Sequence, residues 1–329
     1  MSIIIICVVA ALVFDFLNGM NDAANSIATV VSTKVLSPKL AVLWAAFFNF
    51  ASIFLVGDHV ASTIGKGIVD PIIINEFYIM AALIGAISWT YICTYFGLPI
   101  SVSHALIGGL LGPALYIGGT EYIVTAGITK VVIFIFVSPI VGFILGYLMM
   151  TATMWIFRNT PNHKVDGKFR ALQLLSSAIF SIGHGGNDAQ KTMGIIAVLL
   201  FSTGHLGTEF YIPFWVKISA YTAIGLGTYI GGWKVIKTLG VGLTDLKPVQ
   251  GFNAETAGAL TVIGNTMLGI PVSTTHTITG SIMGVGVTRR LSAVRWGTAT
   301  KIIMAWFLTI PMAVAISFLA FSVISMFVK

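Results

Sequence analysis

Long apolar segments alternate with short polar stretches along the whole chain. They occupy residues 1–17, 38–56, 76–96, 122–157, 210–232 and 296–328. Most are long enough for a helix to cross the roughly 30 Å hydrocarbon core of a bilayer, which takes about 20 residues. Membrane β-strands would alternate polar and apolar residues over about ten positions, and runs such as "VVIFIFV" do not. The pattern predicts an all-α polytopic protein surrounded by lipid.

Composition supports this fold class. The chain has 329 residues, of which 57% are hydrophobic and 9% charged, whereas a soluble domain has roughly 25% charged residues. Lys or Arg is absent before Lys34, so we expect residues 1–17 to be a retained span and not a cleaved signal peptide. The net charge of +7 comes without a basic–aromatic module, so we interpret it as a topology signal and expect no nucleic-acid partner.

The sequence contains an internal duplication. "GLPISVSHALIGGLLG" at 97–112 matches "GIPVSTTHTITGSIMG" at 269–284, and "NGMNDA" at 18–23 matches "HGGNDA" at 184–189. Further matching pairs occur in the same order, at offsets of 166–175 residues. Repeated matches in one order are typical of duplicated folds. We therefore predict a first repeat at 1–157, a basic linker at 158–170 and a second repeat at 171–329.

Loop charges indicate that the two repeats are inverted. The basic loops are 34–39, 288–295 and the linker, whereas the loops equivalent to the first two, 203–213 and 116–122, each contain one Glu and neither Lys nor Arg. By the positive-inside rule the three basic segments face the cytoplasm, which places both termini outside. An even number of crossings is then needed between Lys39 and Arg158, so we expect an extra pass near 58–75.

Two repeat-related acidic residues, Asp22 and Asp188, are surrounded by Val, Ile, Leu and Phe residues. Placing Asp at a helix centre costs about 2.5–3.5 kcal/mol on insertion scales, so Asp22 and Asp188 are functional candidates. Glycines beside both predict unwound helices whose carbonyls join the carboxylates as ligands for a cation. The alternative is a polar contact that only holds helices together. Lys191 either extends to the membrane surface or pairs with Asp188.

The segments "PISVSH" and "PVSTTH" predict a re-entrant hairpin in each half. Gly-x-Pro ends a helix, and the following Ser or Thr is a typical N-cap for the next one. Free N–H groups and hydroxyls at such a tip suit an oxyanion. The alternative is that these hydroxyls bond within their own helices. His104 and His276 have either a structural or a proton-transfer role.

These residues resemble a known family. "NGMNDAAN", "GHGGNDAQKTMGII", "GLPISVSH" and "GIPVSTTH" are similar to the signatures of the inorganic phosphate transporter (PiT) family of secondary carriers, over almost the whole chain. The resemblance implies a cation-coupled symporter with inverted repeats, broken first helices and two hairpins, often a homodimer. Val102 stands where the family has Thr in the first hairpin, so the two tips cannot contact an anion identically.

From the residues and the resemblance together we predict a symporter of the cell membrane that imports phosphate with Na⁺ or H⁺ by alternating access. Sulfate, or a metal–phosphate complex, is the alternative substrate. We expect no cofactor and no enzyme activity, since neither His-Glu-x-x-His nor Gly-x-Ser-x-Gly is present. The predicted phosphate-binding residues are Ser101, Ser103, His104, Ser273, Thr274, Thr275 and His276. The predicted cation-binding residues are Asn21, Asp22, Asn25, Asn187, Asp188 and Gln190, with sodium at Asp22 and Asp188 if sodium is the coupling ion.

Overall fold

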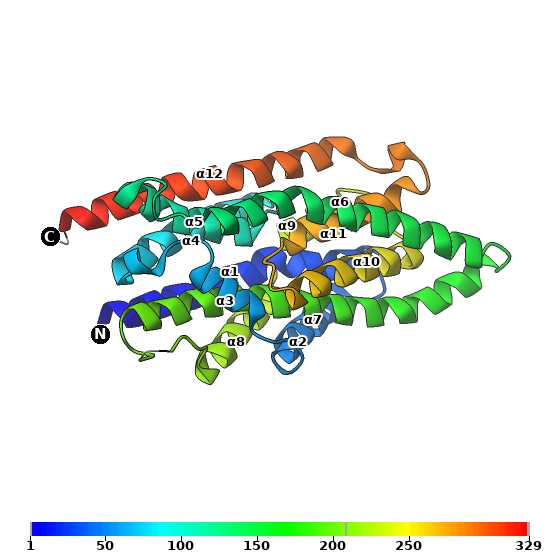
Figure 1. Ribbon diagram of the computed structural model, residues 1–329. Coiled ribbons are helices and arrows are strands. Elements are labelled where there is room, and N and C mark those ends of the chain that lie inside the picture. The colour runs from blue at the N-terminus through cyan, green and yellow to red at the C-terminus, as the bar shows by residue number, and fades with distance from the viewer. Residues whose placement is uncertain (1, 208, 328–329) are drawn as a thin grey trace.

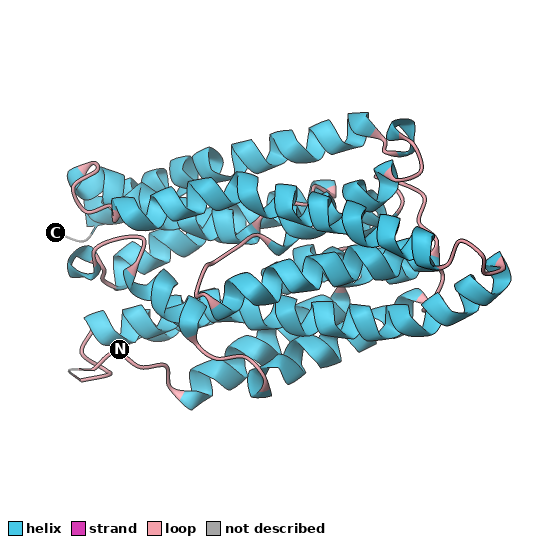
Figure 2. Cartoon of the chain, turned by 45° about the vertical axis from the view of Figure 1, so that its right-hand side comes forward, coloured by secondary structure: helices cyan, strands magenta, loops and turns pink. Residues whose placement is uncertain are grey.

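The computed structural model describes residues 2–207 and 209–327, which form a bundle of helices (Figures 1 and 2). The first half contains α1 (Ser2–Ser32), α2 (Pro38–Ala51), α3 (His59–Lys66), α4 (Glu76–Phe96), α5 (Val102–Gly118) and α6 (Thr125–Ile156). The second half contains α7 (Asn162–Ser202), α8 (Phe214–Ile230), α9 (Trp233–Gly240), α10 (Pro248–Met267), α11 (Thr274–Val287) and α12 (Trp296–Phe327). The predicted all-α fold class is confirmed.

Several helices are suited to cross a membrane. Among the described residues α1, α4, α6 and α12 are long and apolar enough to do so. Many of their large apolar side chains are exposed, including Ile140 on α6 and Leu319 on α12. A membrane protein presents such side chains to lipid, where they are stable. The chain is a multi-pass membrane protein.

Corresponding helices of the two halves run in opposite directions. Figure 1 shows α1 antiparallel to α7, and α6 antiparallel to α12. Both chain ends lie at one end of the bundle, and the connection between α6 and α7 lies at the other. An inverted duplication requires such directions, although the division into repeats at the predicted boundaries remains a prediction.

The halves interlock through their long helices. Helix α6 packs against α11 of the second half, and α12 packs against α5 of the first. Helix α1 contacts α8 and α9, while α7 contacts α2 and α3. Helices α4 and α5 form the first hairpin, and α10 and α11 form the second. Each hairpin is packed against helices of both halves, so the bundle centre lies where the halves meet.

Two apolar cores flank a polar centre. On α1, Phe14 belongs to one core and Ala23 to the other. On α7, Phe180 belongs to the second core and Met193 to the first. Between these positions lie buried polar residues of both helices, namely Asp15, Asn18, Asn21 and Asp22 of α1 and His184, Asn187, Asp188 and Lys191 of α7. The polar centre is thus sealed by apolar packing on both sides.

The predicted extra pass near 58–75 is wrong. Helix α3 has only eight residues, about 12 Å at 1.5 Å per residue, so α2 and α3 together form one interrupted crossing. Helices α8 and α9 repeat this arrangement, interrupted at Gly231, where φ is +69°. The number of membrane crossings between Lys39 and Arg158 is still even, because α4 and α5 form a hairpin that enters and leaves the bundle at the same end. The start of α4 lies beside α1 through Cys7, and the end of α5 lies beside α12 through Ser325.

The predicted unwinding of α1 and α7 is also wrong, because both helices continue through their Asn-Asp segments. The glycines there permit close packing instead. A Cβ on Gly19 would lie 2.2 Å from the Ile224 carbonyl oxygen of α8, and one on Gly185 would lie 2.5 Å from the Asn49 carbonyl oxygen of α2. Real Cβ atoms do not approach that closely, so only glycine allows these helices to touch.

Replacing Gly19 by alanine tests this role. We expect Gly19→Ala to lower the melting temperature in detergent, since overpacking a tight contact costs about 1–3 kcal/mol. The matched control is Gly264→Ala in α10, where the added Cβ meets nothing within 4 Å and alanine improves helix propensity by about 1 kcal/mol. A Gly19→Ala protein as stable as the control would show that the glycine does not serve packing.

Candidate functional site

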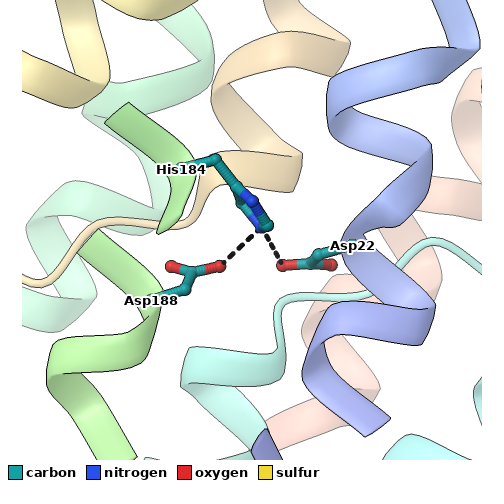
Figure 3. A group of neighbouring side chains, drawn as sticks. All are labelled: Asp22, His184 and Asp188. Atoms are coloured by element: carbon teal, nitrogen blue, oxygen red, sulfur yellow. Dashed lines mark ion pairs between the residues drawn. The ribbon is translucent and has the colours of Figure 1, made fainter. Parts of the chain in front are cut away.

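The two Asn-Asp segments face each other at the bundle centre. Asp22 lies on α1, and His184 and Asp188 lie on α7. One ligand atom from each of these side chains lies within 4.8 Å of the others. The His184 Nε2 atom is 3.1 Å from Asp188 Oδ2 and 3.8 Å from Asp22 Oδ2. Figure 3 shows the imidazole pointing between the two carboxylates, and all three side chains are buried.

The predicted hairpin turns are confirmed. Helix α4 ends at Gly97 with φ of +71°, and α10 ends near Gly269 with φ of +66°, a left-handed conformation that glycine adopts without strain. Ser101 caps α5 by accepting a hydrogen bond from His104 N, and Ser273 caps α11 in the same way. The first N–H groups of α5 and α11 have no partner within their helices, so each tip presents donors.

The tip of the second hairpin contacts both acidic residues. The Thr274 hydroxyl lies 3.3 Å from Asp22 Oδ2 and 3.2 Å from Asp188 Oδ2. The Thr275 hydroxyl donates to Asp22 Oδ1 at 3.1 Å. The Asn25 amide donates to both threonine hydroxyls, at 3.2 and 2.9 Å. Val102 replaces Thr274 in the first hairpin, so the first tip lacks this bridging hydroxyl.

Lys191 links α7 to both hairpin tips. Its ammonium group pairs with Asp188, donates to the Ser103 hydroxyl of the first tip, and lies 3.2 Å from the Val272 carbonyl oxygen of the second. The residue is only 1% exposed. Of the two alternatives left open by the sequence, pairing with Asp188 is confirmed, and extension to the membrane surface is wrong.

Two asparagines occupy repeat-related positions with the same contacts. Asn21 donates to the Thr94 hydroxyl at 2.9 Å, and Asn187 donates to the Thr266 hydroxyl at 2.8 Å. Both amide oxygens are buried without a hydrogen-bond partner. An unpaired buried carbonyl oxygen costs about 1–3 kcal/mol, so these oxygens are available to a cation.

A small cavity adjoins each of these asparagine–threonine pairs. One, of about 240 Å³, includes Leu17, Thr94 and Gly231 in its lining. The other, also about 240 Å³, includes Gly183 and Thr266 at the equivalent positions. The first cavity lies between α4 and the break between α8 and α9, and the second lies between α10 and the break between α2 and α3. The centre therefore has one cavity beside each hairpin.

Gln190 does not belong to the central cluster. Its side-chain oxygen accepts hydrogen bonds from the backbone N–H groups of Val60 and Ala61, at 2.8 and 3.2 Å. Its amide nitrogen donates to the Gly186 carbonyl. Gln190 therefore holds the start of α3 against α7 and has no free oxygen for a cation. The structure therefore does not bring Gln190 together with the other predicted cation-binding residues.

The two hairpin histidines contact each other. The rings of His104 and His276 pack edge to face with centroids 4.9 Å apart, and His276 stacks on Trp306 at 3.8 Å. Both are buried. The described hydrogen bonds and ion pairs do not join either imidazole to Asp22 or Asp188, so these side chains stabilise the contact between the two hairpins.

Known proteins resemble this chain in sequence and in overall structure. The sequence profile described as "Phosphate transporter family" matches residues 18–166 and again residues 156–317. The chain belongs to this family. It is a transporter and not an enzyme, and phosphate is its transported substrate.

Relatives resemble this transporter over its whole length. A protein of Rhizobium meliloti (strain 1021) named "Probable low-affinity inorganic phosphate transporter" is 56% identical, covering 95% of this chain and 94% of that protein. A protein of the same name from Bacillus subtilis (strain 168) is 41% identical, covering 98% and 97%. A solved structure named "The sodium-dependent phosphate transporter" superimposes with a TM-score of 0.89 at 27% identity, covering 99% of this chain and 100% of that one.

Sequence reasoning missed two parts of the candidate site. His184 replaces Asn18 of the first copy and was therefore not predicted to meet both carboxylates. Thr94 and Thr266 were also missed, although their 172-residue separation equals that of the hairpins and could have revealed them. A second buried polar group surrounds Glu255, which accepts from Thr29, Gln173 and Ser176.

Removing the Thr274 hydroxyl tests the site. Thr274→Val keeps the shape but removes the group that contacts both carboxylates, and a buried acceptor without its donor costs about 1–3 kcal/mol. We expect phosphate uptake in proteoliposomes to fall about tenfold to a hundredfold, and Thr274→Ser to restore it.

Thr261→Val is the matched control, because that hydroxyl bonds only within α10. Uptake by Thr274→Val equal to that of the control would remove Thr274 from the site.

Proposed function

We propose that this transporter is a secondary active symporter that imports phosphate together with a monovalent cation, Na⁺ or H⁺, by alternating access. The observation that carries the proposal is the meeting of Asp22 and Asp188 around one threonine hydroxyl at a hairpin tip. Carboxylates repel an anion, so a site that holds both must neutralise them.

The charges of the cluster support cation coupling. Two carboxylates face one fixed ammonium, that of Lys191, and with His184 neutral the group carries one net negative charge. Charges at short distance interact strongly in a buried site, because water screens them little. Phosphate therefore binds well only after a cation has joined Asp22. The structural relative is named as sodium-dependent, which supports the same coupling.

We place phosphate at the hairpin tips, beside the cluster. The first N–H groups of α5 and α11 are the positive ends of helix dipoles, and such ends bind phosphate. The hydroxyls within reach are those of Ser101, Ser103, Ser273, Thr274 and Thr275. Their contacts with Asp22 and Lys191 link the anion site to the cation site. His104 and His276 lie behind the tips, where they support the anion site through their contact with each other.

Alternating access fits the arrangement of the cavities. The cavity beside Thr94 and the cavity beside Thr266 are equal in volume and belong to opposite hairpins. A rocking movement of two related halves would enlarge one cavity and close the other. The interruptions between α2 and α3, and between α8 and α9, lie where such a movement needs hinges.

The remaining features of the proposal come from the loop charges and the resemblance. The basic linker 158–170 is placed in the cytoplasm and both termini outside, in the cell membrane. The two inverted repeats are 1–157 and 171–329. The functional unit is a homodimer, as the resemblance implies.

Replacing Asp22 by asparagine tests the symport mechanism. Asp22→Asn removes the negative charge that attracts the coupling cation, so we expect it to abolish gradient-driven accumulation of labelled phosphate in proteoliposomes. Sodium and proton gradients are imposed one at a time, to identify the ion. The control is Asp70→Asn, because Asp70 caps a turn outside the centre and asparagine caps equally well. Accumulation by Asp22→Asn at the wild-type level would exclude Asp22 as the coupling ligand.

Substrate competition separates phosphate from the alternatives. Near neutral pH phosphate carries a proton that it can donate to a carboxylate, whereas sulfate only accepts hydrogen bonds. We therefore expect excess sulfate to leave labelled phosphate uptake unchanged. The Asp22–His184–Asp188 group also has ligand types found in divalent metal sites, which favours a metal–phosphate complex as the second candidate. Uptake that stops when divalent metals are chelated would establish that candidate.

A further inference from the structure

Lys191 stands at a repeat-related position whose counterpart is neutral. The segments "NDAAN" and "NDAQK" align Asn21 with Asn187 and Asp22 with Asp188, and the same 166-residue offset aligns Asn25 with Lys191. Asn25 lies one helical turn after Asp22 on α1, and Lys191 lies one turn after Asp188 on α7. Equivalent places in the two halves thus hold an amide and an ammonium group.

The surroundings of the Lys191 ammonium are those of a small cation. A carboxylate oxygen of Asp188, a hydroxyl oxygen of Ser103 and the carbonyl oxygen of Val272 surround the nitrogen. Carboxylate, hydroxyl and carbonyl oxygens are the hard ligands that alkali and alkaline-earth cations prefer. The residue is 1% exposed, so the charge is enclosed by protein. In this half the enclosed positive charge is covalently attached to α7.

The counterpart in the other half has the oxygens but lacks the charge. Asp22 receives the hydroxyls of Thr274 and Thr275, and Thr275 is the repeat equivalent of Ser103. The Asn25 amide occupies the place of the ammonium and contacts the same hydroxyls. The Asn25 side-chain oxygen is buried, at 1% exposure of the residue, and has no hydrogen-bond partner. This half therefore offers a carboxylate, two hydroxyls and an unused amide oxygen.

We propose that the Lys191 ammonium is a tethered cation that permanently fills one of two repeat-related cation sites. Only the site formed by Asp22, Asn25 and Thr275 then accepts a mobile cation. This inference rests on the proposed symport. It predicts that one monovalent cation binds in the cluster for each phosphate transported. Tethering also joins the first hairpin tip, through Ser103, to Asp188 without any ion from solution.

The stoichiometry determines how steeply phosphate accumulates. At zero membrane potential, and with one phosphate species, one coupled cation under a tenfold gradient supports about tenfold accumulation, whereas two support about a hundredfold. Wild-type accumulation should therefore change in proportion to the imposed gradient of the coupling ion. Lys191→Asn restores the residue type of the first half and opens the second site, so its accumulation should change with the square of the gradient.

The experiment measures steady-state accumulation of labelled phosphate in proteoliposomes, with the voltage clamped at zero and the gradient of the coupling ion varied. Wild type, Lys191→Asn and the control Lys217→Asn are compared. Lys217 pairs with Asp58 outside the centre, so its variant should follow the wild-type slope. We expect slopes of about one for wild type and about two for Lys191→Asn, on logarithmic axes.

Each outcome decides between the alternatives. A wild-type slope of two overturns the inference, whatever the variant does, because a filled site cannot bind a second cation. A slope of one for an active Lys191→Asn protein also overturns it. If Lys191→Asn binds phosphate without transporting it, the test uses a second measurement, the number of radioactive sodium ions bound per chain in detergent. We expect one bound sodium ion for wild type and two for the variant. Wild type that accumulates no phosphate under any cation gradient would instead reject the proposed symport itself.

Discussion

A carboxylate buried in the membrane interior must be neutralised, and this requirement governs the centre of the molecule. Asp188 is compensated by the ammonium of Lys191 on its own helix, and its Oδ2 atom also lies 3.1 Å from His184 Nε2. Asp22 has hydroxyls and a more distant imidazole, at 3.8 Å, but no fixed cation bonded to it. An isolated charge in a low-dielectric environment is unstable, which is why we propose that a mobile cation neutralises Asp22.

The fold supplies the geometry that brings these groups together. Glycine contacts let α1 touch α8 and let α7 touch α2, which draws both Asn-Asp segments to the bundle axis. The hairpins approach from opposite ends, and their caps at Ser101 and Ser273 direct the helix N-termini toward the centre. Because α6 covers α11 and α12 covers α5, a movement of one half necessarily shifts the hairpin of the other. In the proposed mechanism, Thr274 and Thr275 couple cation binding on α1 to anion binding at the tips, because their hydroxyls contact Asp22.

Much of this architecture could be predicted from the sequence, since hydrophobic segment length and helix-ending residues act locally. The hairpin turns at Gly97 and Gly269 and the serine caps follow from Gly-x-Pro-x-Ser, and the repeated Asn-Asp pairs marked Asp22 and Asp188. The glycines beside Asp22 and Asp188 were predicted to unwind their helices, but they permit close helix packing instead. Glycine can serve either purpose, and only the position of the neighbouring helix distinguishes the two. The contact of His184 with α2, those of Gln190 with α3 and those of Lys191 with the hairpin tips could not be predicted, because these partners lie far away in sequence. The interrupted crossing of α2 and α3 escaped prediction because each piece is shorter than a span.

The most direct test measures phosphate affinity of the purified transporter by calorimetry, at constant ionic strength, with sodium and proton concentrations varied separately. If Asp22 needs a mobile cation before the hairpin tips can hold an anion, affinity must rise with the concentration of one of these ions, approaching about tenfold per tenfold increase below saturation. Phosphate affinity that is the same at every sodium concentration and every pH would contradict the dependence of anion binding on a cation at Asp22.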